Sequence, residues 1–286
     1  MENASESPHL QGEEEDQARS HAPLRALVIH EIVRAEGEAE LQRPVSGMIW
    51  SGLAAGLSMG FSFATEALLK SDLGDGPGMH ALVSLGYTIG FLIVVLGRQQ
   101  LFTESTLTAV LPVLVKPTLG KALKTARLWN VVLAANLVGT WIFAAALWYG
   151  HPLPPETSRS LAELAQETVS KPFWNTLLRA VFAGWLIALM VWLLPSARTA
   201  RILVIMVLTW VVGLAKLSHI IAGSAEAAYA ALSGKSDLWA YVARFLIPTL
   251  IGNSIGGIAL VGMLNHAPVS AEMDPAHEDG EAPQAG

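Results

Sequence analysis

Cysteine is absent from all 286 residues, which excludes disulfide bonds, thiol chemistry and thiolate metal sites. Charge is scarce as well: 15% of the chain is charged, against roughly 25% in a typical soluble domain. Residues 1–43 and 265–286 together carry a net charge of −11, and residues 44–264 carry +5. So apolar a middle section excludes an ordinary soluble enzyme, a disordered protein and a nucleic-acid binder with a basic face.

The two ends of the chain are acidic and polar. Residues 1–22 lack the basic start and apolar stretch of a cleavable signal peptide, so we expect residues 1–22 and 266–286 to be disordered tails. Residues 23–43 place apolar side chains at helical spacing between charged ones. This pattern predicts a cytoplasmic amphipathic helix that lies on the membrane, on a partner subunit or on its own protein.

The middle of the chain contains apolar stretches long enough to cross a bilayer, which takes about 20 helical residues. They are Val45–Leu69, His80–Gly97, Trp129–Tyr149, Leu177–Leu194 and Leu238–Leu264, with a shorter apolar stretch at Ile202–Leu214. The sequence runs from His80–Gly97, the second stretch in chain order, into GRQQLFTEST. It runs from Ile202–Leu214, the fifth in chain order, into AKLSHIIAGSAEA, and apolar residues resume after each. We expect both helices to break at membrane depth and restart, as helices do at transport sites.

Two halves of the chain correspond to each other. The third stretch contains Asn136 three residues before Gly139, and the last contains Asn253 three residues before Gly256. Three spans per half require the halves to be inverted relative to each other. We therefore predict an all-α membrane protein in which residues 44–265 form six transmembrane helices in two inverted three-helix repeats; a coincidence of apolar composition is the alternative.

Basic residues mark one side of the membrane. Residues 116–127 hold four basic residues and no acid, and residues 196–201 hold two arginines, whereas the opposite loops mix acids and bases. The positive-inside rule places the basic loops in the cytoplasm. With six spans, both termini are then cytoplasmic.

The first break holds LFTEST. Leu101 and Phe102 are suited to a dry constriction, and Thr103 to capping the restarting helix, whose positive end favours an anion. Glu104 opposes an anion unless Arg98, Lys216 or a proton neutralises it. The alternative is a surface turn at the membrane edge.

The second break holds KLSHIIAGSAE. Lys216 and His219 are ionisable groups at membrane depth, where such groups usually face a cavity or a partner. His219 can pass a proton near neutral pH, and we expect Ser224 to cap the second restarting helix as Thr103 caps the first. The alternatives are a helix-packing role for His219, and snorkelling or pairing with Glu104 for Lys216.

These segments, LFTE, NLVG, SHIIAG and IGNSIGG, resemble the formate/nitrite transporter family over about residues 24–265. The variants GRQQLFTE and SHIIAGS are most similar to a poorly characterised branch found in the bacterial inner membrane. The resemblance implies an aquaporin-like protomer, a homopentamer with one pore per protomer, and passage of small monovalent anions past Leu101, Phe102, Thr103 and His219. Ser218 and Gly223 depart from the family, which usually has an acid and an asparagine there.

We therefore predict a channel or transporter for formate-like weak-acid anions, embedded in lipid and without cofactor, metal or nucleic acid. The residues expected along the substrate path are Leu101, Phe102, Thr103, Glu104, Lys216, Ser218, His219 and Ser224. A neutral-solute pore and a carrier of another weak acid stay open, although no Asn-Pro-Ala triplet is present. A membrane enzyme or sensor using Ser218, His219 and Glu104 is the other alternative.

Overall fold

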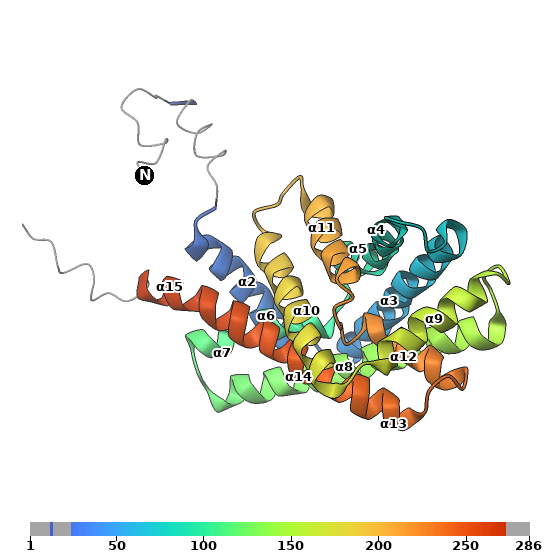
Figure 1. The fold of residues 1–286 in the computed structure, drawn as a ribbon. Helices are drawn as coiled ribbons and strands as arrows, with labels where there is room; N and C mark the ends of the chain where they lie inside the picture. The colour runs from blue at the N-terminus through green and yellow to red at the C-terminus, as the bar shows by residue number, and fades with distance from the viewer. Residues whose placement is uncertain (1–11, 14–23, 273–286) are drawn as a thin grey trace, which may run out of the picture.

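The computed structural model describes residues 12–13 and 24–272, and within this part every regular element is a helix (Figure 1). The predictions of disordered tails for 1–22 and for 273–286 lie outside the described residues, apart from the short turn at 12–13. The helices of the first half are α2 (Ala26–Leu41), α3 (Val45–Leu73), α4 (Met79–Val83), α5 (Thr88–Leu96), α6 (Phe102–Thr108), α7 (Leu111–Val115) and α8 (Leu119–Gly150). A 3₁₀ turn at Ser84–Tyr87 joins α4 to α5.

The second half repeats this order with one long, irregular last helix. Its helices are α9 (Thr157–Ser170), α10 (Phe173–Leu193), α11 (Arg201–Leu214), α12 (Ala222–Leu232), α13 (Leu238–Ala240), α14 (Ile247–Ser254) and α15 (Leu264–Glu272). Two π-helical stretches, Tyr241–Leu246 and Ile255–Met263, join the last three into one rod.

Five helical segments are long and apolar enough to cross a membrane. They are Val45–Leu73, Met79–Leu96, Leu119–Gly150, Phe173–Leu193 and Leu238–Ser270, and each covers one of the long stretches predicted from the sequence. Two shorter apolar segments, Phe102–Val115 and Arg201–Leu214, adjoin the two breaks. At 1.5 Å per residue, 14 residues span roughly 21 Å, which is less than a bilayer core.

Both breaks begin with the same helix ending. α5 stops at Leu96 and α11 at Leu214, and Arg98 and Lys216, at matching places after them, take left-handed φ angles of 51° and 50°. The next N–H turns back onto the helix in each case, from Gln99 to Val94 and from Leu217 to Val212. This is the Schellman motif, in which glycine usually takes the left-handed position. Here Arg98 and Lys216 take it, so the sequence did not indicate these helix ends by a glycine.

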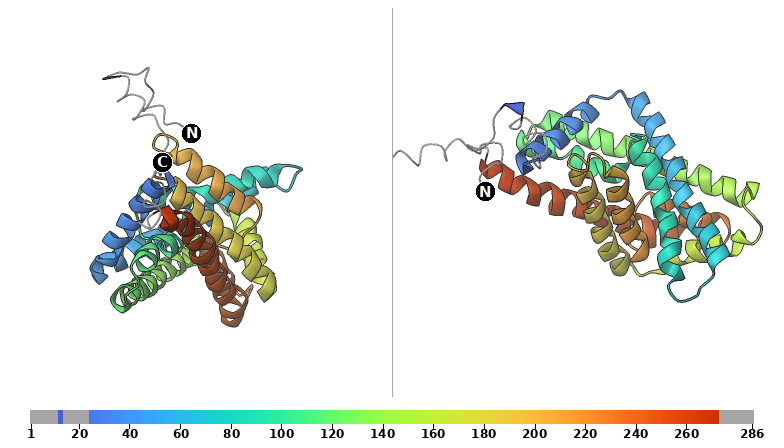
Figure 2. Two further views of the ribbon diagram at one scale, coloured as in Figure 1. Left: turned by 90° about the vertical axis from the view of Figure 1, so that its left-hand side faces the viewer. Right: turned by 90° about the horizontal axis from the view of Figure 1, so that it is seen from above.

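The helix α2 packs on its own chain, against α6, α7, α8, α10 and α15. Its residues Val33 and Leu41 are almost fully buried, and Lys121 at the start of α8 holds Glu38 with a 2.6 Å ion pair. Figures 1 and 2 show α2 and α15 side by side at the end of the molecule where both described termini lie. The helix predicted for residues 23–43 therefore packs on its own protein.

The last helix corrects one boundary. The composition predicts a tail from residue 266, but α15 continues to Glu272. Val269 is buried there and the His266 ring stacks on His30 of α2, with a ring nitrogen of each 3.0 Å apart. Packing against α2 therefore keeps a polar segment helical beyond the membrane span.

The helix α9 was not predicted. Its residues fall in one of the loops of mixed charge that lie opposite the basic loops. Leu161, Ala165 and Val169 lie four residues apart and are buried, so the periodic signal was present. Helix α9 precedes α10 as α2 precedes α3, and Pro172 and Pro44 stand immediately before α10 and α3. In both halves an amphipathic helix is thus followed, after a proline, by a long apolar helix.

Candidate functional site

Two buried asparagines hold the segments that follow the breaks. Asn136 of α8 accepts the N–H of Phe102 at 2.9 Å and donates to the carbonyls of Gly52 and Gln100. Asn253 of α14 does the same in the second half, accepting the N–H of Ile220 at 2.8 Å and donating to the carbonyls of Ala180 and Ser218. The amides thereby satisfy backbone groups that leave the helix inside the protein. Each amide therefore bonds across helices and holds the segment that follows the break of its half.

These matched bonds define which residues correspond between the halves. Phe102 matches Ile220, so Leu101 matches His219, because each stands one residue earlier. The sequence comparison had paired Thr103 with Ser224, which this register does not support. The imidazole of His219 therefore occupies the position in the second half that the apolar side chain of Leu101 occupies in the first.

His219 is buried and is bonded on both ring nitrogens. Its Nδ1 accepts the N–H groups of Ile221 at 3.3 Å and Ala222 at 3.2 Å, at the start of α12. A neutral ring then carries its proton on Nε2, which lies 2.8 Å from the Thr103 hydroxyl. The Phe91 ring meets His219 edge-on with ring centres 5.0 Å apart.

The Thr103–His219 contact joins the two breaks. Leu101, Phe102 and Thr103 are all buried, and Leu101 and Phe102 share an apolar cluster with Ile220 and Ile221. The α6 helix starts at Phe102 without a side-chain cap, so the prediction that Thr103 caps it is wrong. The Thr103 hydroxyl contacts His219 instead, because Asn136 already satisfies the first N–H of α6.

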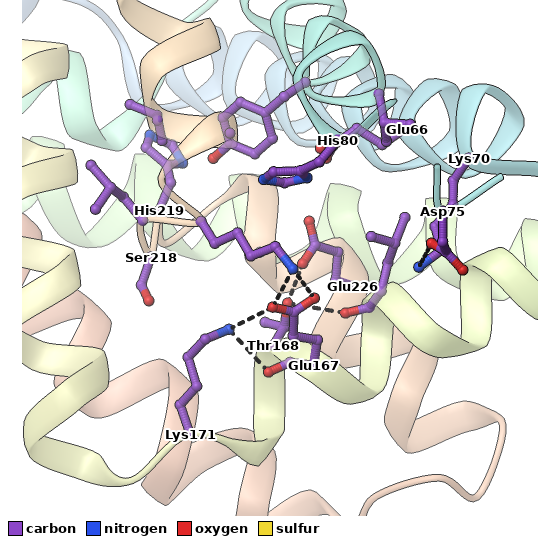
Figure 3. A pocket seen from close by; sticks show the side chains of 18 of the residues that line it. Glu66, Lys70, Asp75, His80, Glu167, Thr168, Lys171, Ser218, His219 and Glu226 are labelled. Atoms are coloured by element: carbon purple, nitrogen blue, oxygen red, sulfur yellow. Dashed lines mark hydrogen bonds and ion pairs between the residues drawn. The ribbon is translucent and has the colours of Figure 1, made fainter. Parts of the chain in front are cut away.

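A cavity of about 220 Å³ opens on one side of His219 (Figure 3). Its polar lining includes His219, Ser218, Glu66, Glu226 and Glu167, which come from α3, α9, α12 and the second break. We call it the His219 cavity. Of the predicted path residues, Lys216, Ser218 and His219 line it; Leu101, Phe102 and Thr103 lie in the packed core, and Glu104 and Ser224 do not line it.

Lys216 forms an ion pair that was not predicted. Its ammonium lies 2.7 Å from both carboxylate oxygens of Glu167, so the alternative in which Lys216 pairs with Glu104 is wrong. Lys216 has a left-handed φ, and its side chain reaches α9, which carries Glu167. Burial alone would raise the pKa of Glu167, but the hydrogen bond from Lys216 and the charges of Lys171, Lys216 and Lys70 together outweigh it, and the pKa lies below its ordinary value.

Glu104 and Ser224 have other surroundings than predicted. One carboxyl oxygen of Glu104 is buried without a partner among the described residues, while Arg98 reaches Glu36 of α2. Ser224 lies inside α12, which begins at Ala222, so it is no cap. Its hydroxyl instead bonds Tyr241 at 2.7 Å and Thr140 at 3.2 Å. His219 takes the capping role because its Nδ1 accepts the first N–H groups of α12.

A carboxyl–threonine contact ties each amphipathic helix to the restarting helix of its half. Glu40 of α2 accepts a 2.6 Å hydrogen bond from Thr108 of α6, and burial raises the pKa of Glu40. On the other side Thr168 of α9 donates to Glu226 of α12. Glu40 and Thr168 match in register, as do Thr108 and Glu226, so the two residue types have changed places.

The enzyme alternative requires His219 to engage Ser218 or Glu104. Among the described residues His219 bonds Thr103 and two backbone N–H groups instead, and the Ser218 carbonyl is held by Asn253. A helical protein with five bilayer-length segments, whose interior cavity reaches a histidine between two broken helices, is a multi-span membrane protein of the transport class.

The comparisons with known proteins agree with this class. The formate/nitrite transporter family matches residues 27–267, and the chain belongs to that family. The inner membrane protein YfdC of Escherichia coli (strain K12) is 41% identical over 251 residues, which cover 88% of this chain and 81% of that protein.

Two solved structures share the fold. A pentameric formate channel with formate bound superposes with a TM-score of 0.67 over 78% of this chain and 97% of its own, at 20% identity. An ion channel of the same family gives a TM-score of 0.70 over 85% of this chain and 96% of its own, also at 20% identity.

Proposed function

We propose that this chain is a membrane passage for small monovalent anions of weak acids, of which formate and nitrite are examples. The observation that carries the proposal is the position of His219. It lines the cavity on one side and bonds Thr103, at the start of the opposite half-helix, on the other. Family membership and the fold shared with a formate channel support the same conclusion.

The proposed mechanism uses three properties of the site. Lysines at the cavity mouth, Lys216 and Lys171, gather an anion. Leu101 and Phe102 keep the passage beyond His219 dry, so a bare charge is penalised there. His219 lowers that penalty because its Nε2–H can bond the anion at the point where the anion takes up a proton, so that the substrate crosses as the neutral acid. The first N–H groups of both half-helices are already bonded to Asn136, Asn253 or His219, so an anion meets their dipoles rather than free N–H groups.

We further propose six crossings arranged as two inverted repeats, with the second and fifth helices broken at membrane depth. The matched asparagine bonds and the matched helix endings at Arg98 and Lys216 support this arrangement. Residues 44–265 then form the membrane domain, with residues 23–43 as a cytoplasmic helix on its surface and both acidic tails in the cytoplasm. The name of the Escherichia coli relative supports the bacterial inner membrane, and the pentameric formate channel supports a homopentamer in lipid.

The orientation can be tested because the chain has no cysteine. We expect an impermeant maleimide to label Arg159→Cys at the α9 end in intact cells whose outer membrane has been opened. Lys124→Cys, on the α8 side that holds α2, should react only after the inner membrane is permeabilised. The reverse labelling pattern would place the termini outside.

The function is tested by solute flux into proteoliposomes of the full chain. We expect formate and nitrite to enter faster than in protein-free liposomes, with a rate that rises as the outside pH falls. Acetate tests the size limit, and stopped-flow shrinkage in glycerol tests the neutral-solute alternative. Glycerol or water flux without formate flux would overturn the proposal.

A further inference from the structure

A buried carboxyl in the His219 cavity has no partner. Glu66 of α3 is 8% exposed and lines the cavity. Among the described residues no hydrogen-bond donor lies within bonding distance of its carboxyl and no cation pairs with it. A buried acid without a partner is costly unless a proton or a ligand neutralises it, so its purpose requires an explanation.

A second carboxyl lines the same cavity. Glu226 stands seven residues after His219, in the second turn of α12, and accepts only the Thr168 hydroxyl among the described residues. Figure 3 shows Glu66 and Glu226 on opposite sides of His80, with Glu167 and Thr168 beyond Glu226. The histidine at the break is therefore followed by two acids along the cavity wall.

The cations around the cavity are already paired. Lys216 and Lys171 both reach Glu167, and Lys70 reaches Asp75 and Glu163. The His80 ring is held by the Leu214 carbonyl. The other charged or titratable side chains that face the two acids are Lys70, Asp75, His80, Glu167, Lys171 and Lys216, together with the Tyr87 phenol and His219 itself. None of the lysines is left over for Glu66 or Glu226.

Two ionised acids would make this wall repel the anion that the passage is proposed to carry. Like charges that share a low-dielectric site do not both stay ionised without a counter-charge. We propose that Glu66 and Glu226 hold one proton between them and deliver it to the weak-acid anion as the anion reaches His219. This inference rests on the proposed function and names the proton source for it.

The transfer balances as a simple acid–base step. The O–H bond of the carboxylic acid breaks, an O–H bond forms on the substrate oxygen, and the carboxylate left behind takes a proton from a hydronium ion of the outside solution, which becomes water. The neutral acid then passes Leu101 and Phe102 without the desolvation cost of an ion. His219 orients the substrate through Nε2, and the acids supply the proton.

The test compares the full-length parent with a Glu66→Gln/Glu226→Gln double variant in proteoliposomes that contain a pH-sensitive dye. We expect the double variant to lose at least about tenfold in formate-driven lumen acidification and to lose the rise in rate at lower outside pH. Glu156→Gln, which changes an exposed carboxyl outside the cavity lining and its ion pairs, is the matched control and should behave as the parent does. A double variant with the parent's rate and pH profile would overturn the inference.

A second readout separates this inference from the proposed function. Infrared spectroscopy of the reconstituted parent should show the carbonyl stretch of a protonated carboxyl that shifts in heavy water and is absent from the double variant. If the parent moves no formate but shows this band, the proposed function fails and the shared proton stands. If the band is missing, or ammonium binds to the parent and not to the double variant, the wall holds a cation and the inference is wrong.

Discussion

The two halves of the molecule share a scaffold and differ in chemistry. In each half an asparagine bonds three backbone groups around a break, and a left-handed cationic residue ends the helix before it. At the matched position after the break, however, the first half has Leu101 and the second has His219. The backbone arrangement is therefore duplicated, while the polar function is carried by one half alone.

The carboxyl–threonine contacts extend this comparison. The first half places the acid, Glu40, on the amphipathic helix and the second places it, Glu226, on the restarting helix. Only the second arrangement brings the acid to the His219 cavity. The same kind of contact thus fastens both halves, but only in the second half does the acid of the contact line the His219 cavity.

The largest effect is expected from breaking the shared scaffold. Asn136→Ala and Asn253→Ala each remove three buried hydrogen bonds and leave backbone groups unsatisfied, at about 3 kcal/mol or more. We expect both variants to lower the thermal midpoint of the purified protein by similar amounts. Asn130→Ala is the control, because Asn130 bonds only the Ala126 carbonyl of its own helix. A large loss in one half only would show that the halves are not equivalent.

The exchange of residue types can be tested directly. Glu40→Thr or Thr108→Glu alone removes the 2.6 Å contact, and we expect a cost of about 1–3 kcal/mol for each in thermal unfolding. The double variant restores the contact in the orientation of the second half and should recover part of this loss. Additive losses in the double variant would mean that the surroundings of the two contacts are not interchangeable.

The first-half contact should also depend on pH. Because burial raises the pKa of Glu40 above its ordinary value of 4.5, the folded state binds this proton more tightly than the unfolded state. Its stabilising contribution is full below pH 4.5 and is lost as the pH rises through the folded-state pKa. We expect the thermal midpoint of Glu40→Gln to fall less with rising pH over this range than the midpoint of the parent. An equal fall in both proteins would contradict the raised pKa of Glu40.

The smallest effect is expected at the helix endings. Arg98→Gly places glycine at a φ of 51°, and its side chain makes only an exposed ion pair with Glu36. We expect a change between zero and a stabilisation of about 1 kcal/mol in thermal unfolding. A loss above about 1 kcal/mol would show that the Arg98 side chain has a larger role than ending α5.

Much of the fold was readable because long apolar stretches have few alternatives. The five long segments and the restart after each break agree with the pattern of apolar residues, and Asn136 and Asn253 indicated the repeat. The helix α9 was missed although its periodicity was visible, because its charges suggested a loop. The continuation of α15 depends on tertiary packing with α2, which sequence patterns do not contain.

The site was harder to predict because its contacts join distant segments. His219 was found from its chemistry, but Thr103 and Ser224 were assigned as caps from local sequence, and both hydroxyls bond across the fold instead. The partner of Lys216 lies on a helix that was not predicted. Glu66 is the only charged residue of the stretch Val45–Leu69, but it was not among the predicted path residues, because only the structure shows that it lines the cavity of His219.

The central claim is that a weak-acid anion crosses past His219. The most direct measurement is formate uptake by proteoliposomes across a range of outside pH, with the parent compared with His219→Gln, which keeps an N–H donor near Thr103. We predict that the variant loses at least about tenfold in rate, or about 1.4 kcal/mol in the barrier, and no longer accelerates on acidification. A variant with the parent's rate and pH profile would contradict the account.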